Sequence, residues 1–138
     1  MSAELRRVEG WPDRLAEFVE TRRERPFAWG AEANDCVSFA IAWVESMTGT
    51  AVRPAAWSSE AEARAALAEA GGIVAAVTGV LGRPTQNYAE ARRGDIGLVD
   101  QETGPGLMIC TGTHWAGPGL DCMLFKPLNL ARLVWRIG

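Results

Sequence analysis

The sequence predicts an α+β domain, in which N-terminal helices pack on a small antiparallel C-terminal sheet, and three observations support this fold class. Apolar residues recur at helical spacing from about residue 11 to residue 82. From about residue 94 to residue 137 they form short runs between glycines and prolines, as strands do. The chain has 138 residues, of which 48% are hydrophobic and 22% are charged, as expected for one globular domain. We therefore expect a single domain over residues 1–138, with helices first and strands afterwards.

The first helix is expected from Trp11 to about Arg25, because Pro26 cannot continue it. Its apolar residues fall on one face. Arginines, Arg22 and Arg23 among them, gather at its C-terminal end. They either interact favourably with the helix dipole or form a site for an anion, and the sequence leaves both interpretations open.

Local capping signals place three further helices. Asn34 or Asp35 can cap a second helix, which Gly49 ends. Ser59 begins a capping-box pattern ahead of an alanine-rich third helix. The apolar residues 72–81 indicate a short fourth helix.

Four short apolar runs in the second half of the chain predict strands. They lie at residues 96–99, 107–110, 123–125 and 133–137. Between the second and the third run, residues 116–119 read Ala-Gly-Pro-Gly and are the clearest turn signal. We therefore expect this turn to join the second and third strands in a hairpin.

Charge and cysteine content argue against several function classes. The net charge is −3 at pH 7, which argues against nonspecific nucleic-acid binding. The three cysteines form no CxxC pair, so we expect neither a disulfide framework nor a zinc site. We expect no cofactor, because the sequence has neither a glycine-rich phosphate loop nor a cluster of metal-ligating residues.

Membrane and secretion segments are not indicated either. The longest weakly polar stretch, residues 71–82, is shorter than the roughly 20 residues that a membrane span needs. The N-terminal residues lack the apolar core of a secretion signal. We therefore expect synthesis in the cytoplasm and no membrane span.

Cys36 is the strongest candidate for chemistry, because it falls in the first turn of the second predicted helix, directly after Asp35. Unpaired backbone N–H groups and the positive end of the helix dipole stabilise a thiolate at such a place and can hold an oxyanion. On these grounds the pKa of the thiol is expected to be lowered. A single cysteine is equally compatible with a small buried side chain.

Three motifs resemble the NlpC-type branch of the papain-like cysteine peptidases. Residues 34–39 read Asn-Asp-Cys-Val-Ser-Phe, residues 94–98 read Gly-Asp-Ile-Gly-Leu, and residues 106–112 read Gly-Leu-Met-Ile-Cys-Thr-Gly. In that branch an Asp-Cys pair begins the central helix and a Gly-Asp pair begins the first strand. The chain is also similar, over nearly its whole length, to a family of small phage and prophage proteins related to this branch. They share a Pro-Phe-x-Trp-Gly motif at 26–30 and a Trp-Arg-Ile motif at 135–137.

The resemblance implies a papain-like fold in which the nucleophile Cys36 faces a histidine on the sheet, and the pair cuts peptide bonds of bacterial cell walls. In active members that histidine stands immediately before the residues that match 107–109, and here this position is Gly106. The general base that the resemblance implies is therefore missing. His114, the only histidine, lies eight residues further along the chain. It is either a hairpin-end residue or, in a different strand register, a partner of Cys36.

Asp95 and the other two cysteines are expected to be structural. Asp95 stands where the orienting acid of a triad would be sought. However, a Gly-Asp pair before a strand more often serves to accept hydrogen bonds from nearby backbone N–H groups. Cys110 and Cys122 fall on predicted strands with apolar neighbours, and we expect both in the core.

The six tryptophans divide into two groups. Those that fit regular elements are expected to be packed, namely Trp11, Trp43 and Trp135. Those in or beside predicted loops are placed to line a glycan groove or a partner surface, namely Trp29, Trp57 and Trp115.

These observations lead to one main interpretation and two alternatives. We expect an NlpC-like protein of a phage tail or tail tip, made in the bacterial cytoplasm, located in the virion tail or a tail-like particle, and bound to tail-tip or baseplate hub proteins. Gly106 would leave it inactive as a peptidase. The first alternative is an active cysteine peptidase or amidase on peptidoglycan peptides, with Cys36 as nucleophile and His114 or a histidine-free arrangement as base. The second is a small prophage-derived protein with an unrelated binding role.

Overall fold

The computed structural model describes residues 5–26, 35–52, 59–101, 104–119 and 121–138. Within these residues the chain forms four α-helices, five strands and two short 3-10 helices. In chain order they are α1 (Trp11–Arg22), α2 (Cys36–Thr48), α3 (Glu60–Glu69), α4 (Ile73–Leu81), η1 (Tyr88–Glu90), β1 (Ile96–Gln101), β2 (Gly104–Cys110), β3 (His114–Pro118), β4 (Met123–Pro127), η2 (Leu128–Leu130) and β5 (Ala131–Trp135). The predicted α+β class, with helices first and a small antiparallel sheet afterwards, is confirmed.

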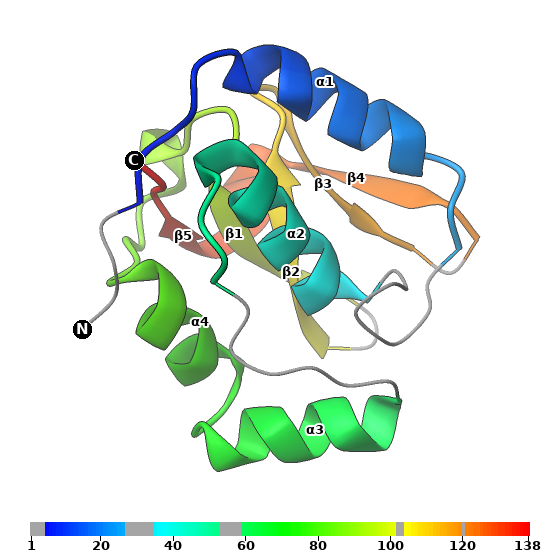
Figure 1. Ribbon diagram of the computed structural model, residues 1–138. Helices are drawn as coiled ribbons and strands as arrows, with labels where there is room; N and C mark the ends of the chain where they lie inside the picture. The colour runs from blue at the N-terminus through cyan, green and yellow to red at the C-terminus, as the bar shows by residue number, and fades with distance from the viewer. Residues whose placement is uncertain (1–4, 27–34, 53–58, 102–103, 120) are drawn as a thin grey trace.

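The strands of the described chain form one antiparallel sheet in the order β4-β3-β2-β1-β5. Strands β1 to β4 follow one another as neighbours, and β5 returns to pair with the free side of β1. In the β1–β2 register, Val99 lies opposite Gly106 and Gln101 lies opposite Gly104. Figure 1 shows α2 lying across one face of this sheet, with α1 above it and α3 farthest from the sheet.

The predicted hairpin turn at residues 116–119 is wrong, because most of these residues belong to strand β3. Residues 116–118 lie within this strand instead of forming a turn, and the chain reverses between β2 and β3 at residues 111–113. The turn-forming residues fit the strand for two reasons. Gly117 leaves room for Met108, whose Cγ lies 3.0 Å from the place that a Cβ would take. Pro118 is the last residue of the strand, where its missing N–H is tolerated.

Local capping fixes the central helix and the third helix where the sequence predicts them. The Asp35 carboxylate accepts a hydrogen bond from the Ser38 N–H at 2.9 Å and caps α2. Gly49 ends α2 with a φ of 67°, a conformation that favours glycine. The Ser59 hydroxyl accepts from the Glu62 N–H and caps α3.

The sheet carries apolar clusters on both faces. The larger cluster lies between the sheet and the helices, with α2 buried along most of its length. The smaller cluster lies on the opposite face and consists of Val99, Met108, Cys110, Trp115, Ala131 and Val134. Apolar side chains are therefore buried on both faces of the sheet.

Three tryptophans are fully buried, and each indole N–H finds an acceptor. Trp43 donates to the Gly94 carbonyl at 2.9 Å, and Trp135 donates to the Thr78 hydroxyl at 3.3 Å. Trp115 lies in β3, beside the reversal at residues 111–113, but it is buried and donates to a backbone carbonyl of η2, so it does not line a surface groove. The partly exposed Trp11 packs against the larger cluster, whereas Trp29 and Trp57 lie outside the described residues.

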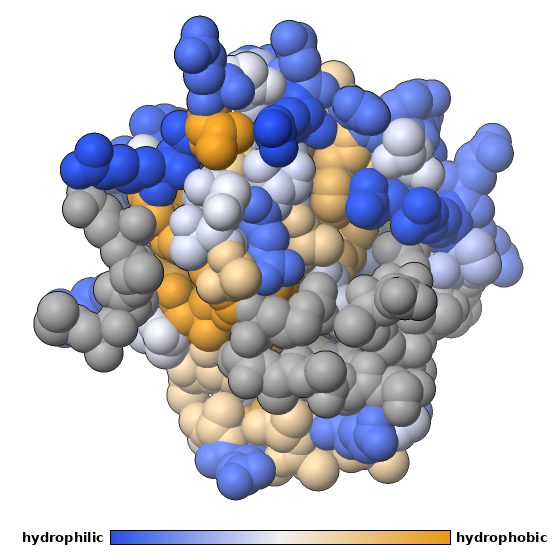
Figure 2. All heavy atoms as spheres, in the orientation of Figure 1, coloured by the Kyte–Doolittle hydropathy of each residue, from blue (hydrophilic) through white to orange (hydrophobic). Residues whose placement is uncertain are grey.

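The helices α3 and α4 form a bent pair at the periphery. In Figure 2, hydrophilic residues gather over α1 and hydrophobic surface is visible over α4, where Val74 is 37% exposed. Among the described residues, no single helix is long and apolar enough to cross a membrane. By length and composition alone, the α3–α4 pair, bent by 71°, passes that test together.

Candidate thiol site

Cys36 is the first residue of α2 and lies beside the sheet. The buried carboxylate of Asp35 accepts hydrogen bonds from the Ser38 N–H at 2.9 Å and the Ser38 hydroxyl at 2.8 Å, which fixes the start of the helix. Cys36 itself is half-buried, and its sulfur lies 3.7 Å from the place that a Cβ on Gly106 of β2 would take. The thiol is therefore held between the helix N-terminus and the second strand.

The expected activation of this thiol is not found, because the pKa of Cys36 is raised. Burial is the largest cause, since it penalises the thiolate. The negative charge of Asp35 raises the pKa further. Backbone N–H groups of Leu107, Val37 and Cys36 itself act in the opposite direction. The helix N-terminus thus stabilises the thiolate as expected, but desolvation and the neighbouring carboxylate outweigh it.

Gly106 lies directly beside the thiol. A Cβ built on this glycine would be 3.7 Å from the Cys36 sulfur, so a side chain at position 106 would contact the thiol. The same point lies 2.8 Å from Nε2 of Gln101, on the neighbouring strand β1. The site that would hold a base beside Cys36 therefore contains a carboxamide from another strand.

His114 is not brought to Cys36. It is the first residue of β3 and is exposed, at the end of the β2–β3 hairpin, where its N–H donates to the Thr111 hydroxyl at 3.2 Å. Cys110 pairs with Trp115, so His114 lies about five residues from Gly106 along β2, or roughly 17 Å. This geometry does not support His114 as the base for Cys36.

Asp95 is a buried structural anchor. Its carboxylate forms an ion pair with Arg7 at 2.8 Å and accepts from the backbone N–H groups of Arg92 and Ile137. The preceding Gly94 has a φ of 90°, and a Cβ there would lie 2.8 Å from the Met47 sulfur. The Gly-Asp pair therefore joins the chain ends to the sheet and does not orient a catalytic group.

The remaining cysteines differ from each other. Cys110 is fully buried, as expected, and burial raises its pKa. Cys122 is exposed, which corrects its expected place in the core, because it precedes β4 in the turn that follows β3. All three cysteines are free thiols. Among the described residues, no group of three or more histidine, cysteine or acidic side chains is placed to hold a metal ion.

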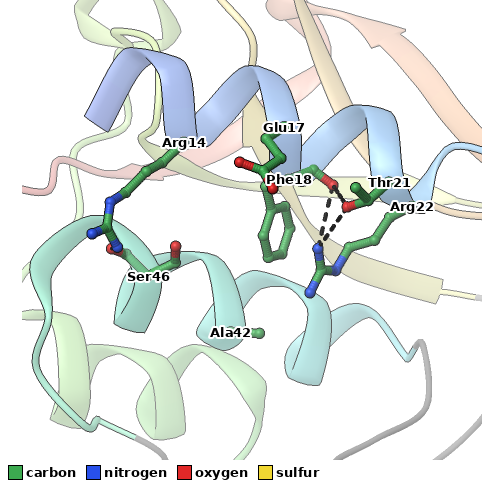
Figure 3. Close-up of a pocket in the computed structure, with 7 residues that line it drawn as sticks. All are labelled: Arg14, Glu17, Phe18, Thr21, Arg22, Ala42 and Ser46. Atoms are coloured by element: carbon green, nitrogen blue, oxygen red, sulfur yellow. Dashed lines mark hydrogen bonds between the residues drawn. The ribbon is translucent and has the colours of Figure 1, made fainter. Parts of the chain in front are cut away.

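A groove of about 420 Å³ lies between α1 and α2, and Cys36 is not among the residues that line it. Figure 3 shows the residues that line it: Arg14, Glu17, Phe18, Thr21, Arg22, Ala42 and Ser46. The Arg22 guanidinium stacks on the Phe18 ring at 3.7 Å and donates to the Phe18 carbonyl oxygen, near the C-terminal end of the helix. Burial, and then the charge of Arg25, lowers the pKa of Arg22. These contacts favour the helix-stabilising interpretation of the arginines at the end of α1.

Gln101 is the one site residue that the sequence did not single out. It carries no reactive group, and its role depends on the pairing of β1 with β2, which places Gln101 diagonally across from Gly106. A glycine in a strand, which often marks a close approach by another group, was the only sequence signal for this contact.

Comparisons with known proteins place the chain in a family. A search of curated proteins finds no match. A family model described as a domain of unknown function, DUF6950, matches residues 6–137. This match covers the helices, the complete sheet and the thiol site. The chain therefore belongs to the DUF6950 family.

Proposed function

We propose that this protein is an NlpC-like domain without peptidase activity, which serves as a structural component of a phage tail tip or tail-like particle. Its partners in this role are tail-tip or baseplate hub proteins. One observation supports the proposed loss of activity. A side chain at position 106 would contact the Cys36 thiol, but the residue there is a glycine. Cleavage of a peptide bond requires a group that takes the thiol proton and returns one to the leaving amine. A glycine supplies neither.

The ionisation of the thiol supports the same conclusion. The raised pKa of Cys36 keeps the sulfur protonated at neutral pH, and the thiol is a poor nucleophile in that form. The only histidine of the chain lies at the other end of β2, so it does not supply the missing base. The association with a phage tail rests on the family resemblance of the motifs around Cys36, Asp95 and Gly106.

A second candidate function is an active cysteine peptidase or amidase that cleaves peptidoglycan peptides. The feature in its favour is that backbone N–H groups of Leu107, Val37 and Cys36 act to lower the pKa of the Cys36 thiol. Such groups can stabilise the oxyanion of an acyl-transfer intermediate. In this case Cys36 is the nucleophile, and a group outside this set must supply the base.

Digestion of purified peptidoglycan separates the two functions. The full chain and its Cys36→Ala variant are incubated with cell walls, and the released peptides are separated by chromatography and identified by mass spectrometry. An inactive domain gives the same trace for both proteins and for a blank. Release that depends on Cys36 would overturn the proposed loss of activity and establish the second candidate.

The place in a tail is tested on particles. Virions or tail-like particles from a host that carries the gene are purified by density gradient, and their proteins are quantified by mass spectrometry. We expect this protein at a fixed ratio to the tail-tip proteins. Its absence from intact particles would refute the structural role, whatever the result with peptidoglycan.

A further inference from the structure

We propose that Gln101 closes the thiol site: its side-chain carboxamide occupies the place that a side chain at position 106 would take, and so shields the Cys36 thiol from reagents. This inference rests on the proposed function, since it explains how the site stays filled after the loss of a base. It concerns access to the same site, because the side chains at positions 101 and 106 compete for one space beside the thiol.

The distances support the assignment. The Gln101 Nε2 atom lies 2.8 Å, and its Cδ atom 3.5 Å, from the point where a Cβ on Gly106 would lie. The Cys36 sulfur lies 3.7 Å from the same point. The carboxamide and the thiol are therefore neighbours around one vacant side-chain position. Real Cβ atoms essentially never approach another atom as closely as 2.8 Å, so a larger residue at 106 must displace the carboxamide.

Strand pairing explains why Gln101 reaches this place. Gln101 lies opposite Gly104, two residues from Gly106 on the adjacent strand. Diagonal neighbours on paired strands are within reach of long side chains. None of the side-chain hydrogen bonds of the described residues involves the Gln101 carboxamide, so it occupies the space by packing.

The backbone itself does not require glycine at position 106. Its φ lies outside the left-handed region that other residues avoid, in contrast to Gly104, whose φ is 118°. A side chain at 106 is therefore compatible with the strand once Gln101 is shortened. A carboxamide neither donates nor accepts a proton at neutral pH, so Gln101 covers the thiol without activating it.

The test measures alkylation of Cys36 by iodoacetamide across pH, with each cysteine read separately by peptide mass spectrometry. The exposed Cys122 reports on the reagent, and the buried Cys110 reports on unfolding. We expect Gln101→Ala to raise the Cys36 rate several-fold relative to Cys122, with little change in apparent pKa. An unchanged ratio of Cys36 to Cys122 alkylation in Gln101→Ala would overturn the proposal.

A double variant tests the coupling between the two positions. Gly106→His alone must compete with Gln101 for space, whereas Gly106→His with Gln101→Ala can place an imidazole beside the thiol. We expect only the double variant to lower the apparent pKa of Cys36 by at least about one unit. The matched control, Gly106→Asn with Gln101→Ala, adds a side chain without a titrating group and is expected to leave the pKa unchanged. If Gly106→His lowered the apparent pKa of Cys36 equally with and without Gln101→Ala, the proposed role of Gln101 would be refuted.

Failure of this inference is distinguishable from failure of the proposed function. Peptidoglycan cleavage by the unmodified chain would refute the loss of activity, but it would leave the ratio of Cys36 to Cys122 alkylation as a separate measurement. Conversely, an unaltered ratio in Gln101→Ala would refute the shielding of Cys36 by Gln101 and leave the proposed loss of activity in place. The two experiments therefore fail independently.

Discussion

Replacement of Asp95 by alanine is expected to destabilise the fold by about 3–5 kcal/mol, the range for removal of one partner from a buried ion pair. Asp95 is fully buried and the Arg7 side chain is only 10% exposed, at a separation of 2.8 Å. The variant leaves the Arg7 charge and the N–H groups of Arg92 and Ile137 without this acceptor. Against a typical total stability of about 5–15 kcal/mol, such a loss is large.

Urea unfolding followed by tryptophan fluorescence measures the effect. With a slope of about 2 kcal/mol per molar urea, the expected loss moves the midpoint down by about 1.5–2.5 M. Asp100→Ala is the matched control, because the Asp100–Arg132 pair at 3.2 Å is 61% and 60% exposed and should contribute less than about 1 kcal/mol. Equal midpoint shifts for the two variants, or a loss below about 1 kcal/mol for Asp95→Ala, would refute the reasoning from burial.

Three further predictions concern packing, capping and pH. Gly97→Ala places a Cβ 2.6 Å from the buried Trp115 ring and should cost about 1–3 kcal/mol, seen as a lower thermal midpoint; an unchanged midpoint would show that the ring can move. Ser59→Ala removes the acceptor for the Glu62 N–H and should cost about 0.5–2 kcal/mol in urea unfolding, whereas Ser59→Asp should restore most of it. Because burial raises the pKa of Cys36, the folded state holds the thiol proton more tightly than the unfolded chain does. The resulting stabilisation is complete below roughly pH 8.5 and is lost as the pH rises through the folded pKa. The fall in urea midpoint from about pH 8 to about pH 10 should therefore be smaller for Cys36→Ala than for the parent, and equal falls would contradict this.

Features that depend on neighbouring residues follow from the sequence alone. The caps at Asp35, Gly49 and Ser59 act within one helical turn, so the starts of α2 and α3 and the end of α2 follow from local rules. Short apolar runs between glycines and prolines similarly located four of the five strands of the described residues. The position of Cys36 at a helix N-terminus, and the structural role of the Gly94-Asp95 pair, were accessible for the same reason.

Features that depend on residues far apart in the sequence arise only in the folded chain. Strand β3 contains Gly117 and Pro118, whose local preference is a turn, and their pairing with β4 overrides that preference. The ionisation of Cys36 was expected from the helix terminus alone, but burial against β2 reverses the direction of the pKa shift. The contact of Gln101 with position 106 exists only because β1 and β2 pair in one register. Burial, strand register and electrostatic balance are properties of the assembled fold, and short-range sequence patterns do not encode them.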